Sequence, residues 1–252
     1  GQIRAAVRNN VVGTDVVARV SCETDCEKFV LISTDKAVNP TSIMGATKRM
    51  AEILVQARNA RSEVAFITVR FGNVLGSAGS VVPLFERQIA EGGPVTVTHP
   101  NVTRFFMTIS EACQLIMQAC VQGKGSETFV LDMGEPIKIS YLAKQLIRMA
   151  GLIPGQDIEI VYTGLREGEK LVEELFHNEE KLEKTPHDQI SLAESRALNS
   201  DSVVNAVRLL TSNIQQSDTD GIEQIMKELV PEYMQRNLVE DTDSARVISF
   251  SR

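Results

Sequence analysis

Residues 33–36 read Ser-Thr-Asp-Lys and bring two hydroxyls, a carboxyl group and an amine together directly after a short apolar run. A carboxyl group beside an amine could supply a general acid and a general base, because burial and neighbouring charges can shift both groups toward proton exchange near neutral pH. A hydroxyl next to them could hold or relay a proton. The same residue types also form simple turns and helix caps, so the cluster alone leaves both interpretations open.

The elements on either side of this cluster would place it at the edge of a sheet. Residues 29–32 (Phe-Val-Leu-Ile) predict a buried strand, and residues 43–60 have helical periodicity. In that helix Met44, Lys48 and Ala51 are spaced to share roughly one face. Open α/β sheets bind their ligands just beyond the carboxyl ends of the strands. A strand that ends in this cluster and faces Lys48 therefore predicts an active site.

The string STDKAVNPTSIMGATKRMAE, residues 33–52, resembles the extended short-chain dehydrogenase/reductase family. Most members carry Tyr-x-x-x-Lys, and here Met44 occupies the Tyr position four residues before Lys48. The string is most similar to the UDP-N-acetylglucosamine 4,6-dehydratases of bacterial polysaccharide biosynthesis (capsule, O-antigen, lipopolysaccharide) that have Met at this position. The resemblance extends from about residue 5 to about residue 187. It implies a UDP-sugar substrate and the cofactor NAD, with NADP less expected.

The resemblance implies a reaction in three stages, which are oxidation of the hexose at C4, elimination of water across C5 and C6, and return of hydride to C6. In this match Asp35 is the acid for the C6 hydroxyl and Lys36 is the base for the C5 proton. Lys48 would hold the nicotinamide ribose, Ser33 would lie beside the cofactor, and Thr34 would contact the C4 hydroxyl. Since Met cannot accept a proton, we expect a relay through Thr34 to replace the usual Tyr.

Residues 2–20 predict a helix. Its apolar stripe consists of Ile3, Val7, Val11 and Val17. Asn10 matches a family Asn that steadies the cofactor and active-site region, or it is an ordinary solvent-facing residue. The strand, Gly-rich turn and acidic residue that open a dinucleotide-binding fold are not found in this sequence. We therefore expect the chain to begin inside a Rossmann domain and to bind NAD weakly by itself.

A second apolar run, at residues 64–71, is typical of a parallel strand covered on both faces. The Gly-rich segment 72–80 follows and leads into a helix over residues 81–90, whose first backbone N–H groups could hold a diphosphate. This segment resembles the family's substrate loop, although its composition alone indicates only a Gly-rich loop. The substrate contacts that the resemblance implies here are Asn73, Ser80 and Val81.

Two further candidates for substrate binding lie in the second half of the chain. Arg104 would suit a phosphate, because the guanidinium group matches phosphate geometry, or it is a surface arginine. Residues 163–170 resemble the family's nucleotide-closing segment, in which Arg166 would pair with the diphosphate and Glu169 with the uridine ribose. Spacing alone indicates a charged turn there. The elements predicted in this half are strands at 94–98, 128–133 and 158–162 and helices at 110–122 and 140–150.

The predicted fold class is α/β, with a doubly wound parallel sheet that forms a partial Rossmann fold and a smaller C-terminal substrate-binding lobe. Residues 1–90 would be the C-terminal part of the NAD-binding domain with the catalytic motif. Residues 91–237 would form the UDP-sugar lobe, with segments that return to the sheet. Residues 215–220 predict a loop or linker, residues 221–234 an amphipathic helix, and residues 238–252 a loose tail.

Composition narrows the class of partner. The chain of 252 residues is 43% apolar and has a net charge of −7 without a basic cluster, so we do not expect nucleic acid as a partner. No apolar run approaches the ~20 residues of a membrane span, and no signal peptide opens the sequence. We therefore expect no membrane contact from these residues. Large members of the resembling family carry membrane spans upstream, which implies an anchored full-length protein, and the family also implies a homo-oligomer.

The cysteines bear on metal binding and on the compartment. Cys22 and Cys26 could begin a metal site, but no second close Cys or His pair follows them. We therefore expect no metal and reduced thiols in the cytoplasm.

Two alternative functions differ from dehydration in what they require. A nucleotide-sugar 4-epimerase of the same superfamily needs no elimination pair and usually needs the Tyr that Met44 replaces, so Asp35 and Lys36 favour dehydration. A non-catalytic sugar-nucleotide binding or assembly module needs none of these groups. Loss of water from UDP-N-acetylglucosamine would separate the three.

Overall fold

The computed structural model describes residues 2–77, 79–177, 180–194 and 199–233, and its main sheet has five strands among these residues. The strands, in spatial order, are β1 (Lys28–Thr34), β2 (Ala65–Phe71), β7 (Thr128–Leu131), β11 (Ile190–Ala193) and β10 (Leu182–Lys184). β1, β2 and β7 run parallel, whereas β11 and β10 add an antiparallel edge. The strand predicted at residues 64–71 is confirmed, and it is buried along almost its whole length.

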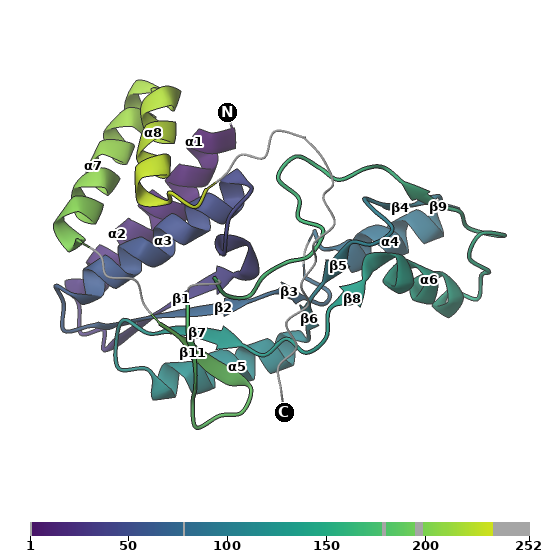
Figure 1. Cartoon of the computed structure of the whole chain (residues 1–252), viewed down its shortest axis with the longest axis horizontal. Helices are drawn as coiled ribbons and strands as arrows, with labels where there is room; N and C mark the ends of the chain where they lie inside the picture. The colour runs from purple at the N-terminus through teal and green to yellow at the C-terminus, as the bar shows by residue number, and fades with distance from the viewer. Residues whose placement is uncertain (1, 78, 178–179, 195–198, 234–252) are drawn as a thin grey trace.

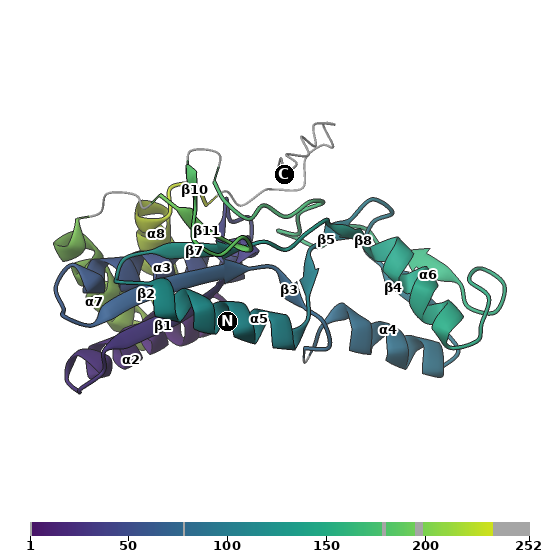
Figure 2. The ribbon, with the colours of Figure 1, turned by 90° about the horizontal axis from the view of Figure 1, so that it is seen from below.

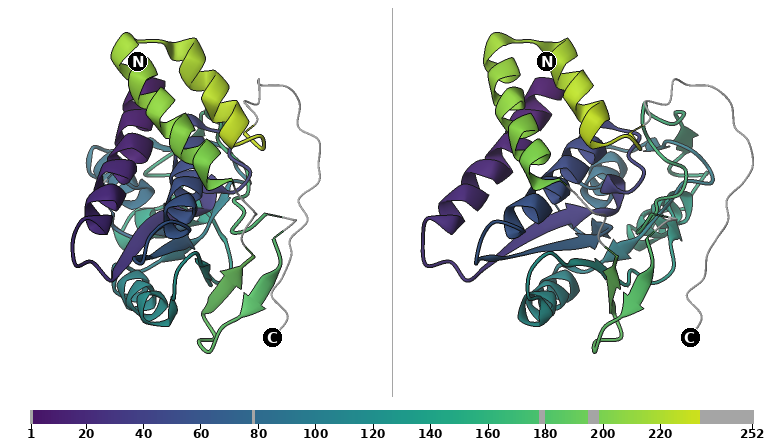
Figure 3. Two further views of the ribbon diagram at one scale, coloured as in Figure 1. Left: turned by 90° about the vertical axis from the view of Figure 1, so that its left-hand side faces the viewer. Right: turned by 60° about the vertical axis from the view of Figure 1, so that its left-hand side comes forward.

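Helices cover both faces of this sheet, as expected for a doubly wound fold (Figures 1 and 2). One face carries α1 (Gln2–Val7), the π-helix η1 (Arg8–Val12), α2 (Gly13–Cys22), α3 (Ile43–Asn59), α7 (Ser200–Gln216) and α8 (Thr219–Leu229). The other face carries α5 (Ile109–Gln122). Figure 3 shows that α7 and α8 form a hairpin beside α1. The α/β prediction is therefore confirmed. None of the helices in the described part of the chain is long and apolar enough to cross a membrane.

Two predictions about the N-terminal region are wrong in detail. Ile32 is 41% exposed, so the run at 29–32 is not wholly buried, because β1 pairs only with β2 among the described residues. Val17 is 57% exposed, and Ala18 instead continues the buried stripe after Val11. A helix returns to nearly the same face after seven residues, as from Val11 to Ala18, but not after six, as from Val11 to Val17.

A smaller lobe extends from the carboxyl ends of the main strands (Figure 1). It consists of α4 (Val81–Ala90), α6 (Ile139–Met149) and the parallel pair β4 (Val95–Val97) and β9 (Ile160–Tyr162). Its core includes Phe85, Ile89, Val95, Ile139 and Ile147. Two short pairs lie between this lobe and the main sheet, namely β3 (Asn73–Val74) with β6 (Phe106–Met107), and β5 (Thr103–Arg104) with β8 (Ile137–Lys138).

The C-terminal part is more helical than the sequence pattern predicts. The loop predicted at 215–220 is reduced to Ser217 and Asp218, because α7 extends to Gln216 and the Asp218 side chain caps α8 by accepting from the Gly221 N–H. The helix predicted at 221–234 ends at Leu229, two residues before Pro231. The predicted tail at 238–252 lies outside the described residues.

Candidate functional site

The Ser-Thr-Asp-Lys cluster is held between the end of β1 and the start of α3. After β1 the chain makes one turn of 3₁₀ helix, η2 (Asp35–Ala37), and α3 begins at an N-cap in which the Ser42 side chain accepts from the Gly45 N–H. A Cβ at residue 45 would overlap the Lys36 carbonyl group, so only Gly allows α3 to approach this turn so closely. The local sequence thus fixes the backbone of the predicted acid and base.

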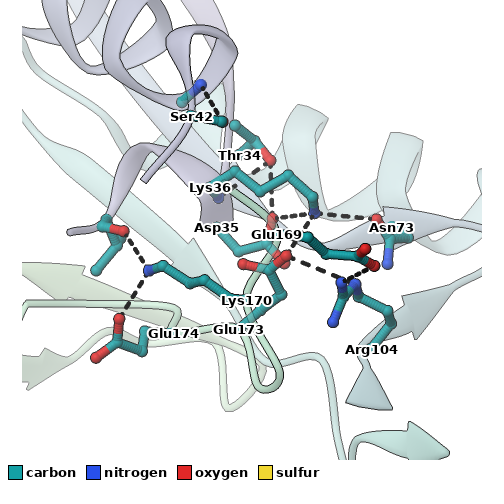
Figure 4. A network of polar contacts seen from close by, with 12 residues as sticks. Thr34, Asp35, Lys36, Ser42, Asn73, Arg104, Glu169, Lys170, Glu173 and Glu174 are labelled. Carbon is teal, nitrogen blue, oxygen red and sulfur yellow. Dashed lines mark hydrogen bonds and ion pairs between the residues drawn. The ribbon is translucent and has the colours of Figure 1, made fainter. Parts of the chain in front are cut away.

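Asp35 and Lys36 form a direct contact (Figure 4). The Lys36 Nζ lies 2.9 Å from Asp35 Oδ1 and donates to Asn73 Oδ1 over 3.1 Å. The Thr34 Oγ1 donates to the same Asp35 oxygen over 2.8 Å. The Asp35 side chain is fully buried, whereas that of Lys36 is 25% exposed. Among the described residues, the side-chain hydrogen bonds of Asp35 lead to Thr34 and to Lys36, which offer paths for a proton.

Arg104 and Glu169, which the sequence analysis treated as separate substrate ligands, bind each other. The Arg104 Nη2 donates to Glu169 Oε1 over 2.9 Å, and Thr98 Oγ1 donates to the same oxygen over 3.0 Å. Arg104 is only 9% exposed, so the alternative of a surface arginine is wrong. The buried Arg104 and the partly buried Glu169 form an ion pair beside the Asp35–Lys36 pair (Figure 4).

Glu173 completes this arrangement, and the sequence analysis missed it. Its Oε1 lies 3.6 Å from both the Lys36 Nζ and the Arg104 Nε, and its side chain is 4% exposed. Burial raises the pKa of Glu173, and repulsion from Asp35 adds to this rise while Lys36 opposes it. No local signal separates Glu173 from its neighbour Glu174, which pairs with Lys170 instead. We call Thr34, Asp35, Lys36, Asn73, Arg104, Glu169 and Glu173 the site cluster.

The segment that carries Glu169 and Glu173 is fastened to the turn before α3. The Lys170 Nζ donates to the Val38 carbonyl group over 2.8 Å, and the Thr41 Oγ1 donates to the Gly168 carbonyl group over 2.8 Å. Gly168 has a φ of 70°, and a Cβ there would run into the Thr41 carbonyl oxygen. These contacts bring residues more than 120 positions apart in sequence into one site.

Lys48 and Asn10 lie on the side of α3 nearer the open edge of β1. The Lys48 Nζ donates to the Ile32 carbonyl group over 2.5 Å, and burial lowers the pKa of Lys48 although Glu52 opposes the shift. The Asn10 Nδ2 donates to Thr47 Oγ1 over 3.0 Å, so Asn10 is not simply solvent-facing. Met44, at the family's Tyr position, is 43% exposed.

Among the described residues, the side chains of the remaining candidates form no hydrogen bond to the site cluster. Ser33 is 3% exposed and neighbours the Glu52 carboxylate rather than Asp35. Ser80 and Val81 begin α4 in the smaller lobe, and within the described residues they form no hydrogen bond to the cluster. Arg166 is exposed, and its backbone N–H donates to Glu169 Oε2 over 3.1 Å.

A second buried group of charges lies behind the site, between β2 and α3. This core cluster consists of Arg49, Glu52, Arg70, Glu180 and Glu232. Arg70 is 1% exposed and donates to both carboxylate oxygens of Glu52 over 2.8 Å, and to both of Glu180 over 2.8 and 3.1 Å. Burial by itself raises the pKa of Glu52, but the attraction of Arg70 and Arg49 and the hydrogen bonds from Arg70 lower it to about 2.

The structure also shows how the His, Cys, Asp and Glu side chains of the described residues are grouped. They contain no group of three or more His, Cys, Asp or Glu side chains that could hold a metal ion. Cys22 and Cys26 are free thiols.

Residues 2–195 match a family model described as polysaccharide biosynthesis protein. Among curated relatives, the capsular polysaccharide biosynthesis protein CapD of Staphylococcus aureus is 57% identical over 176 residues, which is 69% of this chain and 29% of CapD. The chain therefore spans less than a third of the length of this relative.

Solved structures share the fold of this chain. Pen from Bacillus thuringiensis is 32% identical, with a TM-score of 0.67 over 81% of this chain and 68% of that one. DesIV of Streptomyces venezuelae, a dTDP-glucose 4,6-dehydratase with NAD bound, has a TM-score of 0.61 over 87% of this chain and 69% of that one, but at 16% identity it shows the fold alone. The chain belongs to the polysaccharide biosynthesis protein family, and its partial Rossmann sheet is of the short-chain dehydrogenase/reductase type that the motif at residues 33–52 predicts.

Proposed function

We propose that this chain forms the acid–base part of the active site of a nucleotide-sugar 4,6-dehydratase that acts on UDP-N-acetylglucosamine with NAD. The observation that carries the proposal is the 2.9 Å contact between the Lys36 amine and the Asp35 carboxyl group at the carboxyl end of β1. An elimination needs a base and an acid that can exchange a proton, and this contact supplies both. CapD supports the biosynthetic context, and DesIV shows that the fold hosts dehydratases.

Lys36 is the base in this proposal. Its amine is the partly exposed member of the pair, and Asn73 holds it in place from the first residue of β3. A neutral amine there could remove the C5 proton, which is acidic next to a C4 ketone. The proton can then pass to Asp35 across the existing contact.

Asp35 is the acid, and it acts through Thr34. Because the Asp35 side chain is fully buried, it cannot touch a sugar directly in this conformation. The Thr34 hydroxyl, which is hydrogen-bonded to Asp35, can hand one proton on to the leaving C6 hydroxyl while it receives another from Asp35. The same hydroxyl can relay the C4 hydroxyl proton, a role that Met44 cannot fill.

The groups near the open edge of β1 fit a dinucleotide. Lys48 provides an ammonium group suited to ribose hydroxyls, at the strand end where α/β sheets bind nucleotides. Asn10 supports α3 at Thr47, next to Lys48. NAD supplies, when bound, a hydride acceptor for C4 and a hydride donor for C6.

UDP binding is assigned to the lobe side of the site. The exposed Arg166 can reach a diphosphate, and Glu169 can accept from the uridine ribose while Arg104 holds it. Val81, the first residue of α4, can offer its backbone N–H group to the same diphosphate, with Ser80 beside it at the N-cap. The predicted division into a Rossmann part and a substrate lobe belongs to this proposal.

Incubation of the full-length natural protein that contains this chain with UDP-N-acetylglucosamine tests the function. Mass spectrometry should show a nucleotide sugar that has lost one water. A product of unchanged mass with inverted C4 would support a 4-epimerase instead. Binding without conversion would support the non-catalytic module.

A further inference from the structure

Glu173 lies beneath the amine of Lys36, on the segment that crosses the ends of the main strands (Figure 4). Its Oε1 lies 3.6 Å from the Lys36 Nζ, which also contacts Asp35 Oδ1 over 2.9 Å. Two carboxyl groups therefore lie close to a single amine. One further cation, Arg104, is within 3.6 Å of Glu173 but already pairs with Glu169.

Both carboxyl groups have one oxygen that lacks a partner. The Glu173 Oε2 and the Asp35 Oδ2 are buried and accept no hydrogen bond within the described residues. A buried carboxylate oxygen without a donor is unfavourable because its negative charge is not compensated, and protonation of the carboxyl group removes this charge. The geometry therefore disfavours two negative charges around Lys36.

We propose that Glu173 is a positioning residue whose neutral carboxyl group holds the Lys36 amine beside Asp35 and leaves this amine with one anionic neighbour instead of two. The inference rests on the proposed function, because it assigns Lys36 the role of base. Burial and the nearby Asp35 both favour the protonated form of Glu173, while Lys36, Arg104 and Lys170 favour the ionised form. The balance of these groups raises its pKa.

The proton balance of the elimination explains why a neutral Glu173 would matter. Lys36 must lose its proton to Asp35 before it can remove the C5 proton, and Asp35 must receive that proton before it can protonate the leaving hydroxyl through Thr34. After water leaves, the Lys36 ammonium group returns its proton to C5 as the 4-keto-6-deoxy sugar forms, and the C4 hydroxyl proton replaces it at the Asp35–Lys36 pair. Glu173 therefore neither gains nor loses a proton. A negative charge on Glu173 would stabilise the ammonium form of Lys36 and slow the step.

Infrared difference spectroscopy on the full-length protein tests the protonation state without any substrate. The spectrum should contain a protonated-carboxyl stretch at neutral pH that shifts when glutamate is labelled with ¹³C at the carboxyl carbon. The band should disappear in Glu173→Gln and remain in Glu167→Gln, an exposed glutamate of the same segment. Because the isotope shift separates Glu from Asp35 in the parent protein, this reading does not depend on the folding of a variant.

Kinetics then tests the role in positioning. Glu173→Gln keeps the shape and neutrality of the side chain, so kcat at neutral pH should stay within about threefold of the parent. In the parent protein, ionisation of Glu173 should make kcat decline toward higher pH. This decline should be absent in Glu173→Gln and present in Glu167→Gln. Absence of the labelled-Glu band, or a loss of about 100-fold in Glu173→Gln at neutral pH, would overturn the inference. If the parent protein releases no water from the UDP-sugar, the proposed function fails, and the infrared band still decides the state of Glu173.

Discussion

The core cluster and the site cluster are both largely buried, and both join elements that are distant in sequence. They differ in how many of their carboxylate oxygens accept a hydrogen bond. In the core cluster, Arg70 donates to both oxygens of Glu52 and both oxygens of Glu180. In the site cluster, Asp35 and Glu173 each have one buried oxygen that finds no partner in the part of the chain that the structure describes. The pKa shifts follow this difference, since the pKa of Glu52 falls to about 2 whereas that of Glu173 rises.

The difference indicates two uses of buried charge. A carboxylate with a complete set of donors is fixed in its ionised form and can only serve the structure. A carboxyl group with an incomplete set is held less firmly in its ionised form, and perturbed pKa values gather at functional sites. The following predictions test whether the core cluster is structural and the site cluster chemical.

The largest expected effect comes from the two proton-transfer groups. Asp35→Asn and Lys36→Met should each slow dehydration by roughly two to four powers of ten, the usual contribution of a positioned acid or base. Oxidation at C4 should persist, seen as NADH absorbance that rises without loss of water, whereas Lys48→Ala should abolish that absorbance as well. Lys124→Met, a change at an exposed lysine outside the site cluster, is the matched control. Dehydration at the parent rate by both variants would remove these residues from the mechanism.

Substitutions in the core cluster should lower the stability of the folded protein rather than change the chemical step. Arg70→Met leaves the Glu52 carboxylate buried without its main partner, which should lower the free energy of unfolding by about 3–5 kcal/mol. Urea denaturation measures this loss. The double variant Arg70→Met, Glu52→Leu should recover a large part of it, because the unpaired charge is gone. A double variant no more stable than Arg70→Met would contradict the account.

Acid should weaken the core cluster in a defined range of pH. The pKa of Glu52 is about 2 in the folded protein against an ordinary 4.5, so the unfolded chain binds more protons between these values. The stabilisation by Glu52, on the order of 3 kcal/mol, is therefore complete above about pH 4.5 and is lost as pH falls toward 2. Urea midpoints across this range should fall less in Glu52→Gln than in the parent. Equal slopes would show that Glu52 is not held in its charged form.

Glu173 should show the opposite dependence on pH. Because its pKa is raised in the folded protein, its contribution to stability is complete below the ordinary value of 4.5 and is lost as pH rises through its folded value. Glu173→Gln should thus gain stability relative to the parent as pH rises, whereas the exposed Glu167→Gln should not. Urea midpoints of the two variants from acidic to mildly basic pH decide between these outcomes.

The smallest effect is expected at the rim of the site. Arg166 is exposed and would meet only the diphosphate, so Arg166→Ala should raise KM for the UDP-sugar about tenfold and change kcat less. Steady-state kinetics on the parent, on this variant and on Arg148→Ala, an exposed arginine of α6, measures the effect. An unchanged KM would remove Arg166 from the substrate site.

The sequence by itself determined the local elements around the site and the family. The apolar run at 64–71 and the helical period over 43–60 each depend on neighbours a few residues apart, so periodicity was sufficient. The string at 33–52 identified the fold type for the same reason, since its acid, base and Lys48 lie within sixteen residues of one another.

Only the tertiary structure decided which charges meet. Arg104 and Glu169 are 65 positions apart, and Arg70 and Glu180 are 110 apart, so no local pattern could pair them. Glu173 and Glu174 are the sharpest case, because adjacent residues of the same type have side chains that are 4% and 41% exposed. The first faces Lys36 and the second pairs with Lys170. The direction of each side chain depends on how the segment crosses the strand ends, and long-range packing fixes this direction.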